Sequence, residues 1–128
     1  MTLKDKKLLI TDLCARLPFG VYIEHTKSGF MGRLHDIDIF QTYNKDDTVK
    51  DYLCHTNFFG DEVCKIEYFK PYLFPLSSAT KEQKDFLKNN ANTLGVSGLV
   101  DWFNEHHFDH RGLIDKGLAL DATGKNIY

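Results

Sequence analysis

The sequence predicts an α+β fold with an N-terminal helix, a small antiparallel sheet and two C-terminal helices packed on that sheet. Three observations predict it. Apolar residues recur at helical spacing near the N-terminus, short segments rich in β-branched and aromatic residues fill the middle, and helical signals return after residue 80. An SH3-like half-barrel is an alternative arrangement of the same strands.

The first helix is expected over residues 3–17. Its apolar positions repeat every four residues from Leu9 to Leu17, which places them on one face. Thr2 can cap the N-terminus of this helix, and Pro18 ends it because the residue before a proline avoids the helical conformation. The residues assigned to the solvent-facing side are Lys4, Lys6, Lys7 and Asp12.

Four strands are expected in the middle of the chain, where β-branched and aromatic residues are frequent. Turn-forming residues separate them at 27–29, 44–47 and 59–61. Pro71 and Pro75 then favour an extended segment over a helix. The strands are expected at residues 21–26, 30–42, 49–56 and 62–69, with a last short strand at 118–122.

Two helices are expected after the extended segment. Thr80 and Gln83 have the spacing of a capping box, which predicts the start of a helix over residues 81–92. Ser97 can cap a second helix that reaches residue 107. Together with the strands, these helices complete the predicted α+β architecture.

Length, charge and cysteine content limit the class of protein. The 128 residues suit one domain, and 42% of them are apolar. A formal net charge of −2 argues against binding nucleic acid through its phosphates. No run of about 18 apolar residues occurs, the charged N-terminus does not resemble a secretory signal, and three cysteines suggest reduced thiols. We therefore expect one cytoplasmic domain over residues 1–128, with neither nucleic acid nor a membrane as partner.

Four segments form a specific pattern: LCARLPFGV at 13–21, KPYLFPLSS at 70–78, DWFNEHHFDHRGLI at 101–114 and KGLALDAT at 116–123. In this pattern the chain resembles a set of small uncharacterised proteins encoded by gut bacteria and their phages. The resemblance covers both ends of the chain and matches residues 22–69 only loosely. It implies a phage- or mobile-element-associated accessory protein and implies no chemistry. The set more often has arginine where this chain has Phe74, and tyrosine where it has His110.

Residues 105–111 hold the clearest candidate for a metal site. His106 and His110 are four residues apart, so a helix would place both imidazoles on one face, and Asp109 could add a carboxylate. A metal-dependent hydrolase is therefore one alternative function. The competing interpretation is a structural helix end, in which the histidines bind the last carbonyls and Arg111 pairs with an aspartate. The structural interpretation is favoured, because the residue order does not match the H-E-x-x-H motif.

Binding of a small ligand or nucleotide is the other alternative function. Its pocket would lie between residues 70–75 and the C-terminal helices, although no glycine-rich phosphate loop supports it. Cys54, His55 and Cys64 form a further cluster, but their spacing lacks the C-x2-C pair that is typical of a zinc site. The residues expected to line the ligand pocket are Tyr72, Trp102, His107 and Arg111.

The leading functional hypothesis is protein–protein interaction. Residues 36–62 carry seven acidic and two basic residues, a net charge of −5 with histidine neutral, which suits a basic partner. Phe58 and Phe59 are adjacent, so a regular strand cannot bury both, and an exposed ring beside acidic residues is typical of a binding surface. We therefore expect a non-enzymatic accessory protein that binds an unidentified protein or itself. No catalytic residue and no cofactor are predicted.

Overall fold

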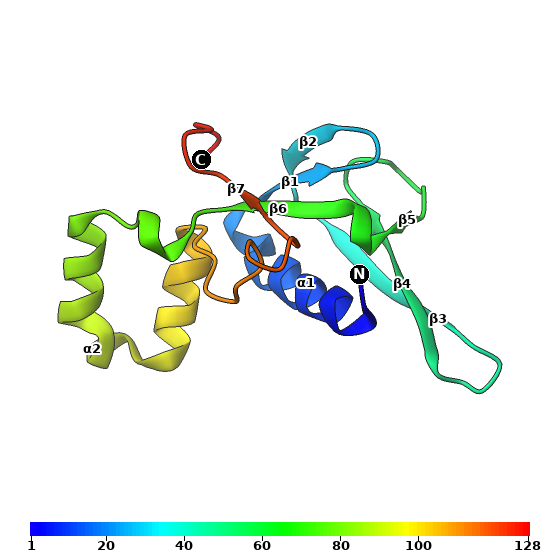
Figure 1. The fold of residues 1–128 in the computed structure, drawn as a ribbon, viewed down its shortest axis with the longest axis horizontal. Coiled ribbons are helices and arrows are strands. Elements are labelled where there is room, and N and C mark those ends of the chain that lie inside the picture. The colour runs from blue at the N-terminus through cyan, green and yellow to red at the C-terminus, as the bar shows by residue number, and fades with distance from the viewer. The chain divides into compact units, whose positions relative to one another are not determined.

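The computed structural model describes all 128 residues and divides them into two compact units, Met1–Pro71 and Tyr72–Tyr128 (Figure 1). The mixed α+β class and the N-terminal helix are confirmed, and the strands of the first unit pair antiparallel as expected. The expectations of one domain over residues 1–128 and of an SH3-like half-barrel stay predictions.

The N-terminal helix α1 spans Leu3–Arg16. Its first turn has the expected capping box, in which Thr2 Oγ1 accepts the Asp5 N–H and the Asp5 carboxylate accepts the Thr2 N–H. The helix ends one residue earlier than predicted, and a 3₁₀-helix, η1, continues from Leu17 to Phe19. Gly20 then reverses the chain with φ of 67°, a conformation that favours glycine.

The prediction that Asp12 and Lys6 of α1 face solvent is wrong. Asp12, assigned to solvent, is fully buried, and both of its carboxylate oxygens lie 2.9 Å from Arg16 Nε, which donates to them. Lys6, also assigned to solvent, is buried, and its Nζ donates to Asp51 Oδ1 at 2.7 Å. Both side chains tolerate burial because an opposite charge is within hydrogen-bonding distance.

Two small sheets follow α1 in the first unit. In one, β1 (Tyr22–His25) pairs antiparallel with β2 (Phe30–Arg33) and with residues 69–71 of β6 (Phe69–Leu73). In the other, β4 (Val49–Thr56) lies between β3 (Ile37–Tyr43) and β5 (Cys64–Lys65). Figure 1 shows β3 and β4 as a long two-stranded ribbon.

Two of the predicted strands are each divided into shorter elements in the structure. The segment 30–42 divides into β2 and β3, because the N–H groups of His35 and Asp36 donate to Asn57 Oδ1 instead of joining a strand ladder. The segment 62–69 divides into β5, a 3₁₀-helix η2 (Ile66–Tyr68) and the start of β6. Loop side chains and helical turns therefore set these boundaries.

The second unit combines a short parallel strand pair with a helix. Residues 72–73 of β6 pair parallel with β7 (Leu120–Asp121), which lies within the predicted last strand. The segment after β6 stays extended, and Phe74 forms a parallel bridge with Phe108. A 3₁₀-helix, η3 (Leu76–Ser78), then leads to the long helix α2 (Lys81–Glu105). Neither α1 nor α2 combines the length and apolar character needed to cross a bilayer.

The prediction of two separate C-terminal helices needs correction. The Thr80–Gln83 capping box is present, but α2 is one element that is interrupted at Gly95, where φ is 68° and ψ is −177°. Ser97, the expected second cap, lies inside α2, because the break falls at the glycine that can adopt this conformation. The break folds α2 on itself, since the Phe86 and Trp102 rings stack with centroids 6.0 Å apart (Figure 1). That these helical segments pack on a sheet stays a prediction.

Candidate functional site

The three residues of the predicted metal site have other hydrogen-bonding partners. His106 Nδ1 lies 2.9 Å from the Trp102 carbonyl oxygen, in agreement with the structural helix end. His110 Nε2 lies 3.1 Å from Asn104 Oδ1. The Asp109 carboxylate accepts two backbone N–H groups, from Leu113 and Ile114. No group of three or more histidine, cysteine or acidic residues is arranged to hold a metal ion.

The four predicted ligand-binding residues all lie in the second unit, and each has a partner there. Trp102 stacks on His106 at 4.2 Å, and His107 stacks on Tyr128 at 3.5 Å. The Tyr128 hydroxyl donates to the Tyr72 carbonyl at 2.7 Å, and Arg111 Nη1 donates to Asn104 Oδ1 at 3.3 Å. A hollow of about 540 Å³ in this unit is lined by Asp109 and His110, among others, and by none of the four.

Cys54 and Cys64 lie directly opposite each other in β4 and β5. Burial, and secondarily the neighbouring Cys64, raises the pKa of the Cys54 thiol to about 12. Burial raises the pKa of Cys64 as well, and the Glu62 carboxylate adds to that shift. Both groups therefore stay protonated thiols at neutral pH, which makes them poor nucleophiles and poor metal ligands in this state.

We expect Cys54 to resist alkylation in the folded protein. At pH 8 a thiol with a pKa of about 12 is ionised to about 10⁻⁴, against roughly 10⁻¹ for the ordinary pKa of 9.0. Iodoacetamide should therefore modify Cys54 at least a hundredfold more slowly in native buffer than in guanidinium at the same pH. Mass spectrometry of the Cys54 peptide measures both rates, and similar rates would contradict this burial.

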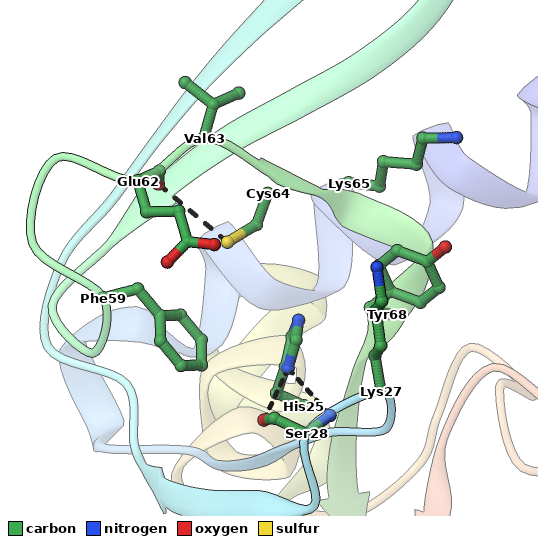
Figure 2. Close-up of a pocket in the computed structure, with 9 residues that line it drawn as sticks. All are labelled: His25, Lys27, Ser28, Phe59, Glu62, Val63, Cys64, Lys65 and Tyr68. Atoms are coloured by element: carbon green, nitrogen blue, oxygen red, sulfur yellow. Dashed lines mark hydrogen bonds between the residues drawn. The ribbon is translucent and has the colours of Figure 1, made fainter.

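A cavity of about 620 Å³ lies in the first unit, where the turn after β1, the loop before β5 and η2 come together (Figure 2). Its base is His25, the last residue of β1, of which 8% is exposed. The imidazole packs against Phe59 with centroids 4.8 Å apart and against Phe69 at 4.9 Å. Tyr68 lies edge-on to the same ring at 5.9 Å. Aromatic contacts from two segments therefore fix the orientation of His25.

The turn that follows β1 sets the hydrogen bonding of His25. Ser28 donates its backbone N–H to His25 Nδ1 at 3.3 Å, and its hydroxyl oxygen lies 2.7 Å from the same nitrogen. That oxygen also accepts the Phe30 N–H at 3.3 Å, and because Nδ1 accepts the Ser28 N–H, the hydroxyl hydrogen is directed at Nδ1. Since Nδ1 accepts these hydrogen bonds, the neutral ring carries its proton on Nε2. Figure 2 shows Nε2 facing into the cavity.

Charged side chains lie near His25 at the cavity. Burial lowers the pKa of His25 below its ordinary value, the Glu62 carboxylate opposes this shift, and the Lys27 ammonium adds to it. Lys27 Nζ lies over the Tyr68 ring, 5.4 Å from its centroid. The balance keeps His25 neutral at pH 7, so that its Nε2–H is a hydrogen-bond donor without a charge.

An aromatic surface adjoins the cavity at β2. The Phe30 ring lies 5.0 Å from Phe58 and 5.9 Å from Phe59. Gly32 makes room for this cluster, because a Cβ there would come within 2.9 Å of the Phe58 ring and 3.0 Å of Phe30. Phe58 and Phe59 are both half-buried, so neither is fully in the core. Phe30 and Met31 are each 44% exposed, which leaves large apolar side chains in contact with water.

β2 has one unpaired side, because it pairs only with β1. Leu34 donates its N–H to the Val21 carbonyl at 2.8 Å, and hydrogen-bonded positions alternate along an antiparallel pair. The main-chain groups of Met31 and Arg33 therefore point away from β1. The Arg33 carbonyl agrees with this, since it accepts the Asn57 side-chain N–H at 3.3 Å. Met31 keeps both its N–H and its carbonyl directed to the open edge.

Sequence reasoning found Phe58 and Phe59 but missed the cavity. His25 and Tyr68 are 43 positions apart, and they come together because β1 pairs with β6, with His25 opposite Phe69. The only local signal was the turn at residues 27–29, which carries Ser28. No protein-family model, no curated protein and no solved structure matches this chain. The resemblance to gut bacterial and phage proteins therefore stays a prediction, and the site must be interpreted from its own geometry.

Proposed function

We propose that this chain is a non-enzymatic protein-interaction module, and that it binds an extended, basic segment of a partner protein as an additional strand beside β2. The observation that carries the proposal is the open edge of β2 at Met31, next to the exposed Phe30 ring. Edge strands with unpaired main-chain groups are templates for strand addition. A folded protein usually protects such an edge with charged residues, a proline or a bulge, and β2 has apolar side chains at its first two positions instead.

The two faces of β2 offer different contacts to such a strand. Phe30 shares one face with Gly32 and is supported there by the Phe58 ring, whereas Met31 projects to the opposite face. Successive side chains of the added strand would therefore meet the phenylalanine cluster and Met31 in turn. Aromatic anchors of this kind supply much of the binding energy at protein interfaces.

Charge favours a basic partner over a second copy of the chain. The seven acidic and two basic residues of 36–62 include Asp61 and Glu62, which follow the phenylalanine pair after Gly60. Two copies paired through β2 would bring these acidic segments toward each other, which costs binding energy. Lysine or arginine next to the apolar positions of a partner would instead be attracted.

Peptide selection with designed variants tests this proposal. Peptides selected from a random display library against the protein should alternate apolar residues and carry lysine or arginine. Met31→Pro should weaken their binding at least tenfold, because proline removes the outward N–H while an edge strand tolerates it. Phe30→Ala should weaken peptide binding by a similar factor, since it removes the exposed aromatic anchor. Raising the salt concentration should weaken the wild-type complex as well.

Phe40→Ala is the matched control, because Phe40 is an exposed phenylalanine, 37% accessible, on another edge strand, β3. It should leave peptide affinity unchanged, and thermal unfolding should show that all three variants are folded. The proposal fails if Met31→Pro binds the selected peptides as well as the wild type does. It also fails if sedimentation shows a dimer that Met31→Pro dissociates, because the edge would then serve self-association.

A further inference from the structure

We propose that the cavity at His25 binds a small zwitterion with an aromatic body, such as an aromatic amino acid. The site is distinct from the edge of β2, because neither Phe30 nor Met31 lines the cavity, although Phe59 and Glu62 border both. Its volume of about 620 Å³ falls within the range of about 300–1,000 Å³ that is usual for small-molecule sites.

The base of the cavity offers a fixed hydrogen-bond donor. The Ser28 N–H and hydroxyl hold Nδ1 of His25 as an acceptor, so Nε2 carries the ring proton and faces the cavity. The contacts with Phe59 and Phe69 prevent the ring from turning away. A donor that is held in this way before binding favours an acceptor such as a carboxylate oxygen, because little side-chain entropy is lost on binding.

Opposite charges flank that donor. Figure 2 shows the Lys27 ammonium beside Tyr68 on one side of His25, and the Glu62 carboxylate beside Cys64 on the other. Both charges are close enough to His25 to act on it electrostatically, with opposite signs. A ligand carboxylate would therefore be attracted by Lys27 and the His25 Nε2–H, and a ligand ammonium by Glu62. A purely anionic or purely cationic ligand would meet repulsion from one of the two.

The space between the charges is bounded by aromatic rings. Figure 2 shows the Phe59 ring directed into the cavity and Tyr68 on the far side of His25. Both rings contact the His25 ring, with the Phe59 centroid 4.8 Å and the Tyr68 centroid 5.9 Å away, so an apolar group bound over His25 would lie against aromatic surfaces. The aromatic body of an amino acid would bury against Phe59, which is the type of contact that supplies affinity in a mixed polar and apolar site.

The test uses three probes that share one ring: phenylalanine, phenethylamine, which lacks the carboxylate, and 3-phenylpropionate, which lacks the ammonium. Titration calorimetry or ¹⁵N chemical-shift mapping should show that phenylalanine binds about tenfold more tightly than either analogue. Each analogue loses one charge-assisted contact, and such a contact is worth about a factor of ten or more. Shifts should be largest at the His25 and Ser28 amides.

Two variants with matched controls separate the charged contacts. Glu62→Gln should weaken phenylalanine and phenethylamine about tenfold and leave 3-phenylpropionate unchanged. Lys27→Met should weaken phenylalanine and 3-phenylpropionate and leave phenethylamine unchanged. The controls remove the same charges outside the cavity. Asp61→Asn and Lys45→Met change exposed residues that do not line it. Neither control should change the affinity of any probe.

Three results would overturn the proposal. Equal affinity for all three probes would show that the ring alone binds. Equal losses in Glu62→Gln and Asp61→Asn would show a general effect of charge and no ligand contact. An absence of saturable binding at roughly 10 mM phenylalanine, where a site with a Kd of about 1 mM would be almost filled, would exclude this ligand class.

Discussion

Replacing Asp12 with leucine while Arg16 remains is expected to lower the free energy of unfolding by roughly 3–5 kcal/mol. Both side chains are 0% exposed, and Arg16 Nε donates to both Asp12 oxygens at 2.9 Å. Removal of the carboxylate leaves a guanidinium in a low-dielectric environment without the negative charge that faces it. The loss is a large part of the roughly 5–15 kcal/mol that stabilises an ordinary domain. Equilibrium unfolding in guanidinium chloride, with the same m-value for wild type and variant, measures this difference in the free energy of unfolding.

The paired replacement shows whether the loss comes from the uncompensated charge. Asp12→Leu combined with Arg16→Met removes both charges and keeps similar volume, so the double variant should be more stable than Asp12→Leu alone. The surface control is Asp38→Leu on exposed β3, which should change stability by no more than about 0.5 kcal/mol. If Asp12→Leu cost as little as Asp38→Leu, the pair would not be buried in solution.

The Asp12–Arg16 pair also shows where sequence reasoning reaches its limit. A charged pair four residues apart on a helix has the same spacing whether it faces water or the interior. Periodicity placed Leu9 and Leu13 correctly in the core, since both are fully buried. Asp12 and Arg16 are fully buried as well, so the buried face of α1 is wider than its apolar stripe, which periodicity alone does not predict.

Local signals predicted the helix starts well. The Thr2 and Thr80 capping boxes are both present, because each depends only on residues three positions apart. The sequence predicted that a second helix starts at Ser97. The break in α2 instead lies at Gly95, because glycine can adopt the positive φ that the break requires. The cavity was not predicted, because its lining joins the turn at 27–29 with residues after position 58 through strand pairing.

The predicted metal ligands illustrate how one sequence pattern can serve packing instead. His106 and His110 have the side chains that a zinc site needs, but the argument from their spacing assumes that the helix continues through both. α2 ends at Glu105, and His107 adopts a positive φ of 62°, so the chain turns before Asp109 is reached. The carboxylate is then directed to the backbone of the following loop, where its two oxygens bind N–H groups.

Asp109→Ala is accordingly expected to destabilise the protein by about 3–6 kcal/mol, because its two hydrogen bonds to a charged group contribute about 1.5–3 kcal/mol each. Asp109 Oδ1 accepts the buried Leu113 N–H at 2.8 Å, and Oδ2 accepts the Ile114 N–H at 2.9 Å. No other carboxylate takes these two donors in the structure. Asp109→Asn should lose less than Asp109→Ala, since the amide oxygen can keep one of the two bonds.

Thermal and urea unfolding with and without a chelator distinguish this structural role from metal binding. A structural role requires the same loss for Asp109→Ala in both conditions, because backbone N–H groups and not an ion are the partners. Asp115→Ala, which removes an exposed carboxylate from the same loop, should cost no more than about 0.5 kcal/mol. A zinc-dependent rise in Tm that the wild type shows and Asp109→Ala loses would instead make the carboxylate a metal ligand. Each Asp109 oxygen gives one of its two lone pairs to the Leu113 or Ile114 N–H, so an ion at the remaining lone pairs would share the carboxylate with these hydrogen bonds.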